Sequence, residues 1–362
     1  MLIAKYLNRL RRLLPLQASA KSRSAGSQRL ESFFALCEDP WGADGLPALE
    51  RALGRRPQPA PLAPEVVDRE KDGDLVREKV SYGVGKGCRG SAYLLYQEQP
   101  DKIRRPAVLA IHGHGGDFSQ GKSKVVRARN TSDTYGYGRG LAQRGFVVLA
   151  PDMAGFEDRQ LIIESRQTPW PFDPERLLHC GLLLHGATLM GLYLFELQRA
   201  LDFLCHCQDM VDPTRIAVIG HSMGGTLAPM LMLIDQRVCA GVSAAGLATW
   251  RSLLDFAVIH NFGAYLPGVL PGSDLDAMLC QLAPRPLMVI AGEQDPNFPL
   301  AGVNALVSSL KKIYAQKGRS ENLAIMIHPG GHPFTEEQQS RAWVFLGRRL
   351  LRSKSEEVEE AR

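Results

Sequence analysis

The sequence has no strong excess of charge, no internal repeat and no apolar run long enough to cross a lipid bilayer. Its formal net charge is only +5 and its Lys and Arg residues are spread along the chain, which argues against a nucleic-acid partner. An integral membrane span is not expected, because a span needs about 20 consecutive apolar residues. The hydrophobic content of 45% is typical of a folded domain with a large core.

The seven cysteines do not form a disulfide framework. Their number is odd and most of them lie in apolar runs, so we interpret them as small buried side chains in a reducing, cytoplasmic compartment. Cys205-His206-Cys207 lacks a second ligand pair at the spacing of a zinc finger, so we expect helical core packing there and no metal site.

Residues 1–74 are predicted to form an amphipathic arm and a linker. The apolar residues of 1–16 fall on one helical stripe, which favours an arm that packs on the body or joins subunits of a homo-oligomer. Contact of this stripe with a membrane surface is the alternative. Ala18-Ser19-Ala20 resembles a cleavage site, but the apolar stretch before it is short, so a secretion signal is less favoured. The proline-rich segment 57–64 predicts a stiff, extended linker.

From residue 75 the hydrophobic pattern is that of a sheet covered by helices. Two segments, 76–82 and 91–96, predict a pair of strands joined through glycines. Continuous apolar runs indicate parallel strands buried on both faces; they are 107–111, 146–150, 216–219, 238–242, 287–291 and 323–327. Helical patterns cover 177–207, 224–234, 300–316 and 336–351.

This order of elements predicts an α/β fold in residues 75–352. The sheet is expected to be mostly parallel and doubly wound, led by an antiparallel hairpin, with helices on both faces. The arm adds an N-terminal helical extension, and residues 353–362 form a charged tail.

A Gly-x-Ser-x-Gly motif lies between one of these strands and the helix that follows it. The run 216–219 leads into Gly220-His221-Ser222-Met223-Gly224, and a helical pattern continues to residue 234. A strand turns into a helix this sharply only through an unusual backbone conformation, which the glycines permit because they lack Cβ atoms. Such a turn places the serine hydroxyl clear of the sheet edge, beside the first amides of the helix. Ser222 is therefore the candidate nucleophile.

Two other strand ends offer partners for this serine, because the loops at the carboxyl ends of parallel strands converge on one crevice. A serine needs a base to take its proton, and His332 lies in a glycine-rich loop after the last predicted strand. The base needs a carboxylate, and both Glu293 and Asp295 follow the strand 287–291. Asp295 is preferred because it lies further into its loop. The chain order Ser-Asp-His is the one expected for an α/β-hydrolase.

An oxyanion hole requires two further donors. The backbone amide of Met223 lies at the start of the predicted helix. The second is expected from the loop 112–116, where the amide of His114 is favoured because the glycines around it permit a close backbone approach. The alternative is that this loop is only a glycine-rich turn.

A competing motif begins in the same loop. Residues 116–123 satisfy the phosphate-binding pattern G-x-x-x-x-G-K-[ST], with Lys122 as its lysine. A nucleotide-hydrolysing P-loop protein is therefore an alternative. The context is poor, because Gly113, His114 and Gly115 separate the pattern from its strand and the helix that should follow Ser123 is interrupted.

Four segments together resemble the dienelactone hydrolase and acetyl xylan esterase branch of the α/β-hydrolases: 111–116, 149–156, 211–225 and 330–332. The resemblance covers about residues 75 to 350. It implies hydrolysis of a small-molecule carboxylic ester through an acyl-enzyme, without metal or organic cofactor. The dienelactone hydrolases themselves use cysteine as nucleophile, so a serine here favours simple ester substrates. The resemblance to the acetyl xylan esterases makes short, acetyl-type acyl groups the expected ones.

The same resemblance implies the roles of five residues. The nucleophile falls on Ser222, the acid on Asp295, the base on His332, and the oxyanion amides on His114 and Met223. An acyltransferase would use the same triad. A peptidase is less favoured because no propeller-sized domain precedes the core, and a non-catalytic binding protein would show an activity profile that does not depend on the serine.

Candidate substrate contacts are aromatic. The segment 247–282 is too long for a minimal turn, so it forms either a cap over the site, with Trp250 among its aromatic residues, or part of a helical core. Trp170 on the opposite wall and Phe298 beside the predicted acid complete the set.

Overall fold

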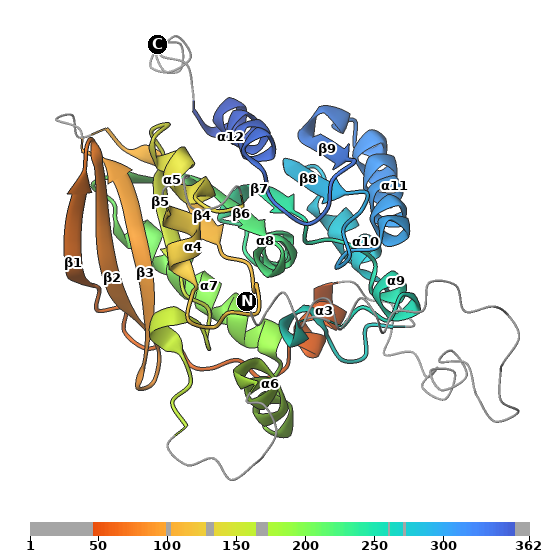
Figure 1. Cartoon of the computed structure of the whole chain (residues 1–362), viewed down its shortest axis with the longest axis horizontal. Helices are drawn as coiled ribbons and strands as arrows, with labels where there is room; N and C mark the ends of the chain where they lie inside the picture. Colours follow the sequence, from red (N-terminus) through yellow and green to blue (C-terminus); the bar gives the residue numbers. More distant parts are fainter. Residues whose placement is uncertain are drawn as a thin grey trace, which may run out of the picture. The chain divides into compact units, whose positions relative to one another are not determined.

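A nine-stranded sheet forms the centre of the computed structural model, which describes residues 46–98, 103–127, 134–163, 173–259, 261–270 and 273–351. Its spatial order is β1-β2-β3-β5-β4-β6-β7-β8-β9 (Figure 1). In chain order the strands are β1 Glu65–Asp72, β2 Leu75–Gly85, β3 Cys88–Gln97, β4 Arg105–Ile111, β5 Val147–Pro151, β6 Val211–His221, β7 Val238–Ala244, β8 Leu287–Gly292 and β9 Leu323–His328.

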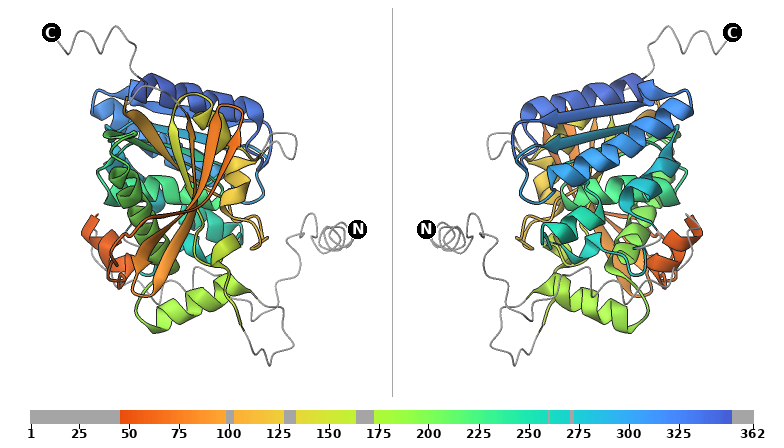
Figure 2. Two further views of the ribbon diagram at one scale, coloured as in Figure 1. Left: turned by 90° about the vertical axis from the view of Figure 1, so that its left-hand side faces the viewer. Right: turned by 90° about the vertical axis from the view of Figure 1, so that its right-hand side faces the viewer.

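The strands predicted from continuous apolar runs are the parallel ones. β5, β4, β6, β7, β8 and β9 pair in parallel, whereas β1, β2 and β3 pair antiparallel and β3 joins β5 antiparallel. Figure 2 shows the antiparallel strands at one edge of the sheet and β9 at the other. The prediction of a mostly parallel sheet is therefore confirmed.

Helices cover both faces of this sheet. They are α3 Leu46–Leu53, α4 Lys122–Val126, α5 Tyr137–Ala142, α6 Pro174–Leu184, α7 Leu189–His206, α8 Met223–Ile234, α9 Trp250–Asp255, α10 Leu275–Leu279, α11 Leu300–Gln316 and α12 Glu336–Leu350. Successive residues of β4 face opposite cores, since Leu109 belongs to the same hydrophobic cluster as α7, α8 and α11, and Val108 to the cluster that contains α4, α5 and α12. Burial on both faces explains why this strand is apolar after Arg105.

Two elements differ from the sequence prediction. β1 lies within the predicted linker region and extends the sheet by one strand, although all its residues are exposed and its sequence shows no apolar alternation. The predicted helix 177–207 is two helices, because Gly186 takes a positive φ of 72° and Thr188 caps the second helix by accepting from the Gly191 amide.

Other predictions fall wholly or partly outside the described residues. The arm 1–16 and the tail 353–362 lie there, and so does Trp170. No helix of the described part has both the length and the apolar character that crossing a bilayer requires. The candidate cap 247–282 contains α9 and α10, whose apolar side chains pack in the same core as α8 and α11.

Candidate active site

The serine of the Gly-x-Ser-x-Gly motif occupies the sharp turn between β6 and α8. Ser222 has φ 57° and ψ −119°, a conformation that costs a non-glycine residue about 1–3 kcal/mol. A Cβ atom on Gly220 would overlap the carbonyl oxygen of Gly224, and one on Gly224 would overlap that of Ile111. Both glycines are therefore required by close backbone approach, and together they allow the strained serine.

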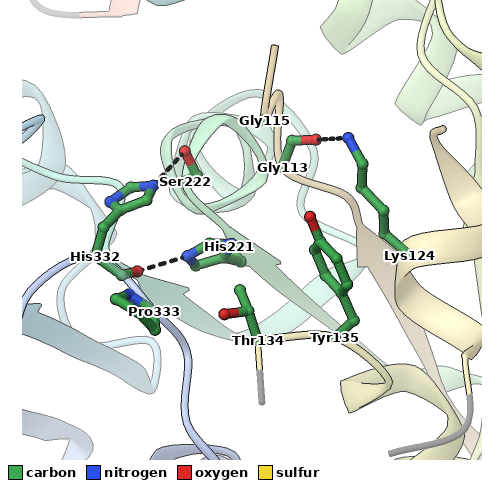
Figure 3. Close-up of a pocket in the computed structure, with 9 residues that line it drawn as sticks. All are labelled: Gly113, Gly115, Lys124, Thr134, Tyr135, His221, Ser222, His332 and Pro333. Atoms are coloured by element: carbon green, nitrogen blue, oxygen red, sulfur yellow. Dashed lines mark hydrogen bonds between the residues drawn. The ribbon is translucent and has the colours of Figure 1, made fainter. Parts of the chain in front are cut away.

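Ser222, His332 and Asp295 form one line of hydrogen bonds. The Ser222 hydroxyl lies 3.0 Å from His332 Nε2 (Figure 3), and His332 Nδ1 lies 2.9 Å from Asp295 Oδ2. The carboxylate fixes the tautomer, since Nδ1–H must donate to it and Nε2 is left to accept from the hydroxyl. Asp295 is 7% exposed, and its other oxygen accepts from the Asn297 amide at 2.8 Å.

The loops that carry the acid and the base are joined by backbone hydrogen bonds. The Glu293 amide donates to the His328 carbonyl and the Gln294 amide to the Gly330 carbonyl. The contact is close, because a Cβ on Gly292 would overlap the carbonyls of the second loop. Within this arrangement the side chain of Glu293, the alternative acid, is exposed to solvent, and Asp295 is the carboxylate that meets the imidazole.

Two further side chains lie against the base: His221, whose role was not recognised from the sequence, and Phe298, which was predicted as a substrate contact. His221 Nε2–H donates to the backbone carbonyl of His332 at 2.9 Å (Figure 3), which ties the base to the serine turn. Burial lowers the pKa of His221 to about 3, so this ring is neutral and remains a donor. The ring of Phe298 lies parallel to the His332 imidazole at 6.0 Å between centroids. Phe298 is thus stacked beside the base and is not among the residues that line the cavity next to Ser222, and its role as a substrate contact stays a prediction.

The predicted oxyanion donors belong to two segments that lie next to the serine. Met223 is the first residue of α8, where a backbone N–H has no acceptor within its own helix. The loop after β4 also comes close to the serine, since a Cβ on Gly113 would lie 3.3 Å from that of Ser222. His114 follows directly in this loop. Its ring Nδ1 accepts from the Gly116 amide, and its Nε2 lies 3.2 Å from the buried carboxylate of Glu175.

A cavity of about 220 Å³ opens beside the nucleophile (Figure 3). Its lining is Gly113, Gly115, Lys124, Thr134, Tyr135, His221, Ser222, His332 and Pro333. None of the described residues of 247–282 lines this cavity, so a cap over it is not seen there. Trp250 is 3% exposed and its indole N–H donates to the Ala264 carbonyl, which makes it a core residue. The prediction that Trp250 contacts substrate in this cavity is therefore wrong.

The P-loop alternative is not supported by the contacts of its lysine. Lys122 is fully buried, and its ammonium donates to the carboxylates of Asp152, Glu157 and Asp158 at 2.7–2.8 Å. Burial alone would lower the pKa of Lys122, but these three partners raise it above its usual range. The charge of Lys122 is therefore neutralised inside the protein and is not directed at a phosphate.

The fold and the geometry of this site are those of an α/β-hydrolase with a serine nucleophile, and comparisons with known proteins agree. Residues 195–346 match the family model described as the Prolyl oligopeptidase family. The chain is also 28% identical over 302 residues to YtaP of Bacillus subtilis (strain 168), a protein named as a hydrolase; the alignment covers 82% of this chain and 96% of YtaP.

Three solved structures of similar fold are named as esterases. Methylesterase BT1017 has a TM-score of 0.61 at 19% identity, with 80% of this chain covered but only 58% of that longer protein. A glucuronoyl esterase from Solibacter usitatus has a TM-score of 0.58 at 16% identity, covering 83% and 89% of the two chains. Acetyl xylan esterase 1 from Thermoanaerobacterium sp. JW/SL YS485 has a TM-score of 0.56 at 15% identity, covering 82% and 97%. The chain therefore has the α/β-hydrolase fold, and residues 195–346 are similar to a family of serine hydrolases.

Proposed function

We propose that this protein is a serine esterase that cleaves carboxylic esters with short, acetyl-type acyl groups. Ser222 attacks the ester carbonyl while His332 takes its proton, and Asp295 stabilises the imidazolium that forms. The amides of His114 and Met223 receive the oxyanion. His332 then protonates the departing alcohol and activates water, which releases the acyl group from the serine.

The observation that carries this proposal is the hydrogen-bonded line from hydroxyl to imidazole to buried carboxylate, at 3.0 and 2.9 Å. The cavity beside it supports a small acyl group, because 220 Å³ is below the roughly 300–1,000 Å³ of pockets that hold drug-sized ligands. The esterase neighbours support an ester as the bond cleaved.

The test is hydrolysis of p-nitrophenyl esters of increasing acyl length by the wild type and by Ser222→Ala. We expect the acetyl ester to be cleaved fastest and the variant to lose at least about 10⁴-fold in kcat, as loss of a triad nucleophile costs in other serine hydrolases. Hydrolysis that is unchanged in Ser222→Ala would refute the serine mechanism. A maximum at long acyl chains would refute only the proposed acyl preference.

Cleavage of peptides is the second candidate, and the match to the Prolyl oligopeptidase family favours it. Matched acyl p-nitroanilides separate the two bonds, because they change only the leaving group. Turnover of the anilide at a rate equal to that of the ester would favour the peptidase.

Adding a primary alcohol to the ester assay and analysing the products would reveal an acyltransferase by the new ester formed.

A further inference from the structure

The ammonium group of Lys124 is a buried cation that the proposed mechanism does not use. Lys124 belongs to α4, is 2% exposed and lines the same cavity as Ser222 (Figure 3). Its hydrogen-bond partners among the described residues are two successive backbone carbonyls, Gly113 at 3.3 Å and His114 at 2.9 Å. Both carbonyls belong to the loop expected to supply an oxyanion donor, so the cation is bonded to the backbone of that loop.

The geometry of a peptide group connects this contact to the reaction. The Gly113 carbonyl and the His114 N–H belong to one planar trans peptide, and therefore point in opposite directions. Figure 3 shows the Gly113 carbonyl directed at Lys124 and away from Ser222. A bond that holds this carbonyl on the Lys124 side consequently turns the His114 N–H toward the serine.

His112 provides a second anchor for the same carbonyl. Its Nε2 accepts from the Met153 amide at 3.1 Å, so its proton is on Nδ1, which donates to the Gly113 carbonyl at 3.0 Å. Burial lowers the pKa of His112 to about 3, which keeps the ring neutral and its tautomer fixed. One carbonyl oxygen thus receives two donors from the side opposite the nucleophile.

We propose that Lys124 is a positioning residue, which together with His112 fixes the 113–114 peptide so that the His114 N–H donates to the oxyanion of the tetrahedral intermediate. This inference rests on the proposed esterase function. The protonated amine also polarises the carbonyl to which it is bonded, and polarisation along a chain of hydrogen bonds strengthens the N–H at the other end of the peptide. Lys124 itself does not touch the substrate in this scheme.

The charge of Lys124 responds to pH in an accessible range. Burial lowers the pKa of Lys124 to about 8. The surrounding charges shift this pKa in both directions, since Asp117, Glu157 and Asp152 raise it and Arg127 lowers it. Four further titratable side chains face the ammonium group from the 112–114 loop, the serine turn and the cavity wall: His112, His114, His221 and Tyr135. If the charged form orients and polarises the peptide, kcat declines as the pH rises through about 8.

The test compares kcat and KM for p-nitrophenyl acetate between pH 6 and 10 in the wild type, Lys124→Met and Lys124→Arg. Lys311→Met, on the exposed face of α11, is the control for loss of one lysine charge. We expect Lys124→Met to lose about 10²–10³ in kcat at pH 7, the cost of one oxyanion donor, with KM within about threefold. The decline near pH 8 disappears in this variant, and Lys124→Arg recovers part of kcat without that decline. Lys311→Met follows the wild type.

Three results would overturn the inference. A folded Lys124→Met with wild-type kcat shows that the lysine does not position a donor. A rise in KM at constant kcat assigns Lys124 to substrate binding. If Lys124→Met does not fold, a wild-type kcat that stays level to pH 10 overturns it, whereas a decline centred near pH 8 supports it. Activity that persists in Ser222→Ala would instead refute the proposed function, so the two failures are distinguishable.

Discussion

Replacing Lys124 with methionine is expected to change how the stability of the protein depends on pH. The pKa of a lysine is ordinarily 10.5, and burial lowers that of Lys124 to about 8 in the folded protein. The gap is 2.5 pH units, and each unit corresponds to about 1.36 kcal/mol of difference between the two protonation states. The folded protein therefore bears a penalty of about 3 kcal/mol for holding this charge at neutral pH.

The direction of the pH dependence follows from the pH at which each state loses the proton. Below pH 8 both the folded and the unfolded chain hold the proton, and the penalty is fully present. Between pH 8 and 10.5 the folded protein releases the proton while the unfolded chain keeps it. The unfolded state then binds more protons, so the free energy of unfolding increases with pH. Above 10.5 the penalty is gone. Lys124→Met removes the charge and with it this pH-dependent contribution.

The assay is urea unfolding, followed by tryptophan fluorescence at pH 7, 8.5 and 10, in wild type, Lys124→Met and Lys311→Met. The free energy of unfolding of Lys124→Met minus that of the wild type is expected to fall by about 2 to 3 kcal/mol from pH 7 to pH 10. The contributions of all other titrating groups cancel in this difference between the two proteins. The hydrogen bonds and packing that the variant loses change the difference by the same amount at every pH. A difference that does not vary with pH would refute the assignment of a penalised buried charge. Lys311→Met should show no such slope.

Three further substitutions test separate parts of the site. Gly224→Ala is expected to destabilise the protein by at least about 2 kcal/mol in urea unfolding, because its methyl group overlaps the Ile111 carbonyl; a loss under 0.5 kcal/mol would contradict the close approach. Lys122→Met should cost about 3–5 kcal/mol in the same assay by leaving buried carboxylates unpaired, and a neutral effect would show that the cluster relaxes. His221→Phe keeps an aromatic ring but frees the His332 backbone, so kcat should fall between about 10- and 100-fold at unchanged KM, and unchanged kcat would show that the bond is not needed.

Most of the fold could be predicted from the sequence because a strand that is buried on both faces has a continuous apolar sequence. β4, β6 and β8 each contain a continuous apolar run, and each is a parallel strand with a neighbour on both sides. β1 has no such apolar run. It lies at the sheet edge with every residue exposed, so its pairing with β2 depends on backbone hydrogen bonds that any sequence can form.

Part of the site could also be predicted from the sequence and part could not. The meeting of Ser222, His332 and Asp295 could be anticipated because strand ends of a parallel sheet converge, and that rule needs only the order of elements. The contacts of His112, His221 and Lys124 could not, because each is bonded to a backbone carbonyl whose direction is set by the local turn. Residue type and spacing carry no information about that direction. The same limit explains the misleading phosphate-binding pattern, which matches in letters but places Lys122 in a buried ionic cluster.

The two lysines of α4 differ in the groups to which they are hydrogen-bonded. Lys122 and Lys124 are both buried, lie two residues apart and point to different surroundings. Lys122 is held by three carboxylates, so its charge is compensated and it anchors the segment after β5 to the helix. Lys124 is bonded only to carbonyl dipoles among the described residues, which leaves a net charge beside the nucleophile at a cost in stability. Folding alone would favour an apolar side chain there, and the proposed role of Lys124 in orienting the 113–114 peptide toward the oxyanion accounts for the charge.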